Sequence, residues 1–117
     1  MAADLIGVLG QAATDLANNE ITVYTVPAGR VAVLSTVAIC NTSTATTYRI
    51  YIRRGGITYA GTIAPAYAIA YDVPLGANQT DALTWGITLA AGDAISAMSA
   101  SARCSYAVFG EETDTPT

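Results

Sequence analysis

The sequence predicts an all-β fold: a single β-sandwich of about eight strands with either a jelly-roll or an immunoglobulin-like topology. Apolar and polar residues alternate with a period of two over most of the chain, the pattern of half-buried strands. Turn-forming Gly, Pro and Asn residues recur at intervals of roughly 8 to 12 residues. A helical signal is confined to residues 11–20, a span too short and too polar for a stable helix. Because a sheet that is apolar on one face needs a second sheet to cover it, the strands should form two layers.

The longest predicted strand covers residues 31–40, directly after the turn sequence "VPAGR". Both of its faces are mostly apolar, so we expect a central strand that is covered on both sides. In regular alternation one face carries Val31, Val33, Ser35, Val37 and Ile39, and the other carries Ala32, Leu34, Thr36, Ala38 and Cys40. Residues 46–54 indicate a half-exposed strand, in which Arg49, Tyr51 and Arg53 point outward.

Five further strands are expected, at residues 57–60, 68–75, 82–90, 94–101 and 104–111. Gly55 and Gly56 predict a hairpin turn before the first of them, and residues 61–67 a loop or edge segment. Pro74 should mark the end of the second. Residues 82–90 give the clearest core strand, because the large apolar side chains share one face: Leu83, Trp85, Ile87 and Leu89.

The chain divides into an N-terminal arm at residues 1–20, a β-sandwich domain at residues 21–112 and a flexible acidic tail at residues 113–117. The arm carries apolar side chains that such a sandwich does not need for its core: Leu5, Ile6, Val8 and Leu9. A segment of this kind becomes ordered when it adds a strand to a neighbouring protein or docks in one of its grooves. These four residues are therefore the first candidates for partner binding. The alternative is that residues 5–9 form an ordinary edge strand of the sandwich.

The chain is poor in charge. Of its 117 residues 12% are charged, about half of the usual share, and the net charge is −4. Interface cores are depleted in charged residues, so we expect a surface that is largely buried against copies of the chain or other proteins; the alternative is an ordinary Ser- and Thr-rich β-domain. The acidic balance argues against a nucleic-acid partner. No apolar run reaches the ~20 residues of a membrane span, and residues 1–11 lack the basic region of a secretory signal, so we expect no membrane partner and synthesis in a cytoplasm.

The residue types argue against an enzyme. With no His and no Lys, the usual general base, the imidazole metal ligand and a Ser-Lys dyad are all missing. Asp72 and Asp81 could pair as in a glycosidase, but both lie beside turn residues where Asp is favoured for local hydrogen bonds. Cys40 and Cys104 are too few for a zinc site, and no glycine-rich phosphate loop is present, so we expect neither a metal nor a cofactor. Buried free thiols are favoured over a disulfide in a cytoplasmic product, although the two cysteines could be neighbours in a sandwich.

Four segments carry a resemblance in strand and turn pattern: "VYTVPAGRVAVLSTVAICN", "TYRIYIRRGG", "YDVPLGANQTDALTWGITLAAGDAI" and "YAVFGEE". Together they span residues 23–112, and they resemble small structural proteins encoded by tailed bacteriophages. The resemblance implies a non-enzymatic β-sandwich subunit of the virion, assembled in the cytoplasm of the bacterial host. The first choice is a capsid cement (decoration) protein that binds and stabilises the head shell, because the chain is a small product with extended ends. A tail-tip, baseplate or fibre component for host attachment is the alternative, and an immunoglobulin-like adhesin module is the third choice.

The expected partners follow from the same resemblance. They are the chain itself, as a homo-oligomer and by virion analogy a trimer, and the major capsid protein or another virion protein. The second-choice contact residues for such a partner are Arg49, Arg53 and Arg54.

Overall fold

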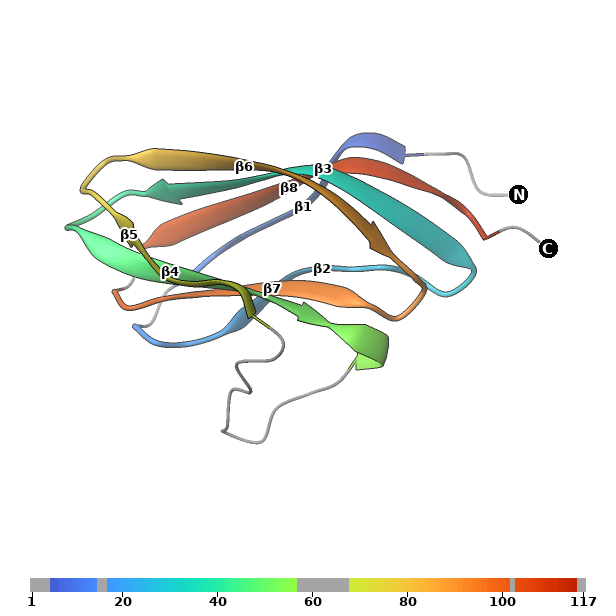
Figure 1. Cartoon of the computed structure of the whole chain (residues 1–117), viewed down its shortest axis with the longest axis horizontal. Helices are drawn as coiled ribbons and strands as arrows, with labels where there is room; N and C mark the ends of the chain where they lie inside the picture. The colour runs from blue at the N-terminus through green and yellow to red at the C-terminus, as the bar shows by residue number, and fades with distance from the viewer. Residues whose placement is uncertain (1–4, 15–16, 57–67, 102, 116–117) are drawn as a thin grey trace.

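The computed structural model describes residues 5–14, 17–56, 68–101 and 103–115. Eight described strands form two antiparallel four-stranded sheets, stacked as the upper and lower layers in Figure 1. Sheet A contains, in spatial order, β1 (Leu5–Ala13), β8 (Cys104–Asp114), β3 (Arg30–Asn41) and β6 (Thr80–Leu89). Sheet B contains β2 (Ile21–Thr25), β7 (Ala94–Ser99), β4 (Thr46–Arg53) and β5 (Ala68–Leu75). A single 3₁₀ turn, η1 (Arg54–Gly56), follows β4.

The order of the strands decides between the two predicted topologies. Every connection between consecutive described strands crosses from one sheet to the other, except that from β4 to β5. This interleaving, with the first and last strands adjacent in one sheet, is the eight-stranded jelly roll. An immunoglobulin-like sandwich instead divides seven or nine strands as ABED and CFG sheets. The predicted β-sandwich is confirmed, and its jelly-roll form is the one observed.

The core lies between the sheets and draws on both. Its fully buried large side chains are Tyr48, Tyr106, Leu34, Ile39, Ile50, Leu75, Leu89, Ile95, Val26, Val37 and Val108. The prediction that Cys104, Tyr106 and Val108 share a face is confirmed, because all three are buried on β8. Among the described residues, no helix is long and apolar enough to cross a membrane.

Strand β3 is central, as predicted, but its two faces are not the predicted ones. The register shifts between Leu34 and Thr36 on both sides of the strand. Opposite β8, Leu34 pairs with Gly110 and Thr36 with Phe109, so β3 carries one extra residue there, a β-bulge. The bulge exchanges the faces: Ala32 and Leu34 are buried before it, and Val37 and Ile39 after it. Strict alternation along residues 31–40 was therefore wrong for half of the strand.

Two further strands differ from the expectation. Strand β6 places Leu83, Trp85 and Ile87 toward the core, but it is an edge strand and leaves all three half-buried. On β4 the predicted faces are confirmed, because Tyr48 and Ile50 lie in the core while Tyr51 contacts Arg49 and Arg53 on the opposite face. Tyr51 and Arg53 are nevertheless buried on that face, so the half-exposed character predicted for the strand is wrong. Arg53 is held there by an ion pair with Glu20, from the segment before β2.

The ends of the chain are more regular than expected. Residues 5–13, assigned to an arm, form β1, which is the edge-strand alternative that the sequence left open. The helical signal at residues 11–20 gives no helix among the described residues there, since 11–13 complete β1. Strand β8 continues to Asp114, into the expected tail, because Asp114 pairs with Arg30 across the sheet. The strand expected at residues 57–60 and the loop at 61–67 lie outside the described residues.

Candidate functional site

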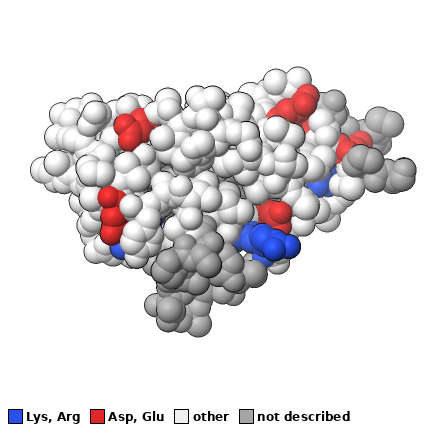
Figure 2. All heavy atoms as spheres, in the orientation of Figure 1, with Lys and Arg blue, Asp and Glu red and all other residues white. Residues whose placement is uncertain are grey.

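The outer face of sheet A is almost uncharged among its described residues. The residue pairing across β1, β8 and β3 points these side chains away from the core: Ile6, Glu111 and Val33; Val8 and Phe109; Gln11, Ala107 and Ala38; Ala13, Ser105 and Cys40. On β6 the outward residues are Thr80, Ala82, Thr84, Gly86 and Thr88. Glu111 is the one charged side chain among the described residues of this face. Figure 2, which views the sandwich from the side, likewise shows few charged atoms between large uncharged areas.

One half of this face exposes large apolar side chains. Ile6 is 79% exposed, Val8 56% and Val33 47%. With Phe109 and Glu111, Ile6 and Val33 line an open groove of about 520 Å³. Scattered exposed apolar residues are ordinary on a protein surface, but a contiguous group marks a site of association.

The predicted first-choice residues are divided by this arrangement. Ile6 and Val8 lie on the outer face of sheet A, whereas Leu9 points inward and packs against the core. The backbone of Leu5 pairs with Glu112 at the start of β1, and its side chain lies outside the described part of the structure. The sequence identified this apolar run, and alternation separates Leu9 from Ile6 and Val8, but the sequence could not show which of the two faces the second sheet covers.

The second-choice arginines are engaged with other side chains of sheet B or exposed at its end. Arg49 binds Asp72 through both carboxylate oxygens, at 2.6 and 3.2 Å, and lies 4.0 Å from the centre of the Tyr71 ring. The hydrogen bond from Arg49 lowers the pKa of the Asp72 carboxyl. Arg54 is exposed in η1. Of the two, Arg54 offers the more accessible charge to a partner.

Arg53 belongs to a buried ion pair. It is 3% exposed, and its guanidinium lies 2.8 Å from the carboxylate of Glu20, which also accepts a hydrogen bond from Ser96. Burial raises the pKa of Glu20, and the contacts with Ser96 and Arg53 oppose that rise. A side chain held in this way is part of the folded frame, so a role for Arg53 in binding a partner stays a prediction without direct structural support.

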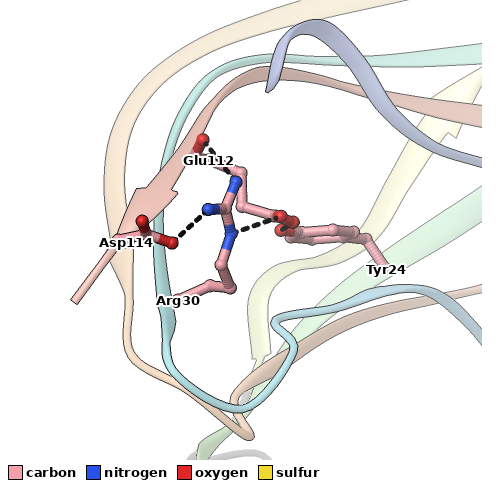
Figure 3. Close-up of polar contacts among 4 residues, drawn as sticks. All are labelled: Tyr24, Arg30, Glu112 and Asp114. Carbon is pink, nitrogen blue, oxygen red and sulfur yellow. Dashed lines mark hydrogen bonds and ion pairs between the residues drawn. The ribbon is translucent and has the colours of Figure 1, made fainter. Parts of the chain in front are cut away.

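A second buried charge cluster was not anticipated from the sequence. Figure 3 shows Arg30 between Glu112 and Asp114, with Tyr24 donating a hydrogen bond of 2.5 Å to Glu112. The guanidinium of Arg30 lies 3.0 Å from Glu112 and 2.5 Å from Asp114. Hydrogen bonds to Asp114 and Glu112 raise the pKa of Arg30, and burial, with the bond to Glu112, raises that of Tyr24. Every group in this cluster has a partner of opposite charge or a hydrogen bond, so the cluster stabilises the end of sheet A and offers no free reactive group.

The cysteines lie on neighbouring strands but on opposite faces. Asn41 pairs with Cys104 and Cys40 with Ser105, so the Cys104 thiol points into the core and the Cys40 thiol outward. Both cysteines are free; Cys104 is buried, as predicted, whereas Cys40 is half-buried. Burial raises the pKa of the Cys104 thiol, which disfavours the reactive thiolate. Among the described residues there is also no group of three or more side chains that could hold a metal ion.

Comparison with known proteins gives a likeness of fold. No protein-family model and no curated protein sequence matches the chain. A chain in the structure of infectious bursal disease virus, Gx strain, superposes with a TM-score of 0.55 at 11% identity, over 94% of this chain and 31% of the viral chain. A chain of the Gt strain gives a TM-score of 0.45 at 10% identity, over 94% and 32%. This chain therefore spans about a third of the length of either viral chain, and the first likeness shows that it shares its sandwich fold with part of a protein in a virus structure.

Proposed function

We propose that the protein is a non-enzymatic structural subunit of a virion, and specifically a cement protein that binds the head shell of a tailed bacteriophage. The observation that carries the proposal is the uncharged outer face of sheet A on a jelly-roll sandwich. The jelly roll is a common architecture of viral capsid domains. A face with one charged side chain among its described residues, and with Ile6, Val8 and Val33 exposed, suits burial against another protein.

The buried polar groups of the described residues favour a structural role over catalysis. The described polar clusters at Arg30 and at Arg53 are closed by their own ion pairs, and the buried thiol of Cys104 has a raised pKa. None of these three groups places a nucleophile beside a base, an arrangement that acyl- or glycosyl-transfer chemistry requires. The likeness to a chain of a virus structure agrees with the structural role, although that likeness is one of fold.

The alternatives place the subunit elsewhere. A tail-tip, baseplate or fibre component could use the same apolar face to join its neighbours, and it stays the second choice. The third choice, an immunoglobulin-like adhesin module, loses support because the strand order is that of a jelly roll and the cysteines point to opposite faces of sheet A.

Antibody labelling of virions tests the proposal directly. Purified particles from a phage that encodes the chain would be labelled with gold-conjugated antibody against the recombinant protein and imaged by negative-stain electron microscopy. We expect label over the head shell and none with antibody depleted on the recombinant protein. Label at the tail tip or fibres would favour the alternative, and particles without label would contradict a virion role.

Two features of the proposal concern its partners. We propose the major capsid protein as the larger partner, with Ile6 and Val8 as the described first-choice contact residues and Arg54 as the best exposed second-choice one. A threefold arrangement of the subunit rests on the virion analogy. Mass photometry of the recombinant chain reports the oligomer number independently of any virion.

A further inference from the structure

The outer face of sheet A has a bulky half and a small half. Ile6, Val8, Val33 and Phe109 lie toward the C-terminal end of β8. Toward the N-terminal end of β8 the same face carries mostly small side chains, and these line an open depression of about 450 Å³ together with the exposed Gln11: Ala13, Ala38, Cys40, Ser105 and Ala107. A projecting apolar group and a depression thus lie side by side on one surface.

The exposed charges at the two ends of β8 have opposite signs. Glu111 is exposed at the bulky end. Arg103 is exposed at the other end, where it lines a depression together with Ala13 and Ser105. Neither forms an ion pair with another described residue. Ala107 lies midway between them, four residues from each (111 − 107 and 107 − 103).

We propose that a second copy of this chain covers the outer face of sheet A in a twofold pair. The twofold axis lies in the plane of the interface, runs perpendicular to the strands and passes over Ala107. This rotation lays β8 of one copy antiparallel over β8 of the other. Glu111 of each copy then faces Arg103 of the second copy, and Phe109 and Val8 enter the depression of the small half. Because a twofold interface is self-complementary, each of these contacts forms twice.

The size of the face is sufficient for such a pair. Four strands spaced by about 4.8 Å, over about eight residues at about 3.4 Å each, give roughly 500 Å² per copy. The pair would then bury roughly 1,000 Å² in total, near the lower limit of specific interfaces. Ala107 and Ala38 are small and let the two sheets approach closely, while Gln11, beside Ala107, would lie against Gln11 of the second copy. The −30° twist between aligned sheets is the usual geometry of such packing.

The pair rests on the surface of the subunit and not on the virion role. It also gives an alternative to the threefold arrangement, which comes from the virion analogy alone. The pair covers the face that carries Ile6 and Val8, so a paired subunit would join a head shell through other surfaces, such as the exposed Arg54. The location in the virion and the oligomeric state are therefore tested by separate experiments.

Charge reversal tests the pair. The wild type, Arg103→Glu, Glu111→Arg and the double variant would be compared by sedimentation equilibrium, in reducing buffer so that Cys40 cannot crosslink. We expect the wild type at twice the 12.0 kDa of the chain. Each single reversal places two like charges opposite one another at both ends of the interface, so it should raise the dissociation constant by roughly tenfold or more. The double variant restores opposite charges, so its dissociation constant should lie within about threefold of the wild-type value.

Two more variants separate the interface from the fold. Ala107→Arg puts a charge on the axis and should give a folded monomer, as judged by circular dichroism. Arg54→Glu reverses a charge at the end of sheet B and should leave the pair intact. A wild type that is monomeric throughout the micromolar range, or single reversals without effect, or a double variant that stays monomeric would overturn the proposal. None of these results would alter the outcome of virion labelling.

Discussion

Glu112 is the residue at which a charge enters the core of the sandwich. It is 5% exposed, and its carboxylate binds both Arg30 and Tyr24. The sequence contains a signal for it, since Glu112 continues the inward series of Tyr106 and Val108 on β8. A charged residue on an inward face needs a buried partner, and Arg30, at the start of a strand that is otherwise apolar, is a candidate for it. The assignment of residues 113–117 to a tail hid the second partner of Arg30, which is Asp114.

Replacing Glu112 by Gln should destabilise the fold by about 3 kcal/mol, because breaking one partner of a buried ion pair leaves a charge uncompensated. Arg54→Gln is the control: Arg54 is an exposed charge outside the proposed pair, and its loss should change the free energy of unfolding by less than about 0.5 kcal/mol. Urea denaturation of both variants measures the difference. Equal losses would mean that the cluster contributes nothing specific.

Gly110 lies opposite the bulge of β3. A Cβ at this position would collide with the backbone oxygen of Val33 and lie 2.9 Å from the Cα of Leu34. Since these are backbone atoms in a paired strand, they cannot move aside cheaply. Gly110→Ala should therefore lower the free energy of unfolding by about 2 kcal/mol. Gly86→Ala, on the outer side of β6 with open space around it, should be nearly neutral, and a comparable loss in both would contradict the steric account.

Tyr106 should make the free energy of unfolding decrease as the pH becomes alkaline. Burial raises the pKa of its hydroxyl from 10.0 to about 12. The unfolded chain then loses this proton at a lower pH than the folded one, so the stabilisation is complete below pH 10 and is lost as pH rises toward 12. The free energy of unfolding should fall by about 2 kcal/mol more in the wild type than in Tyr106→Phe over that range. Parallel curves would contradict this assignment, and the interval from pH 7 to 9 serves as the internal control.

At the scale of elements, the assignment of β1 to an arm is the difference between prediction and structure that matters most for the fold. Its apolar residues were set aside because eight other strands were expected. In the structure β1 pairs with β8 along its length, and Leu9 and Ala12 pack against the core. Period-two patterning identifies a strand but does not identify which strand of the chain it will pair with. Pairing partners far apart in sequence are set by the whole topology, which local pattern does not contain.

Deleting residues 2–12 should therefore destabilise the sandwich strongly, since it exposes one edge of β8 and part of the core. The matched variant is Ile6→Thr with Val8→Thr, which keeps β1 and its backbone pairing but removes the exposed apolar groups. We expect this double variant to melt near the wild-type temperature and to weaken association. A deletion variant with an unchanged melting temperature would restore the arm interpretation.

The bulge in β3 shows the same limit within one element. The alternation along residues 31–40 was correct in type, and the central position of the strand followed from its two apolar faces. One extra residue at Ser35 reverses the orientation of the side chains in half of the strand, and neither residue type nor spacing indicates that insertion.

At the scale of the whole molecule, composition and periodicity were enough for a two-layered β-sandwich. They could not choose the jelly roll, because connection order depends on which strands cross between sheets. Low charge predicted an associating surface, but only the folded sheet gathers Ile6, Val33 and Phe109 from three distant segments into one groove. Similarly, the sequence did not show that the fold pairs Arg49 with Asp72 and Arg53 with Glu20, and the role of these arginines in binding a partner stays a prediction.

The adjacency of the first and last strands has a consequence for synthesis. β8 is the shared neighbour of β1 and β3, so sheet A has a gap between them until residues 104–114 are available. On the ribosome, β1 and β3 would emerge early, and their edges would stay unpaired until β8 is synthesised. Folding dominated by such distant pairings is slow, on the order of milliseconds to seconds. During translation the unpaired edges of β1 and β3 and the apolar faces behind them are open to other chains, so a ribosome-associated chaperone would find its binding surface there before β8 closes the sheet.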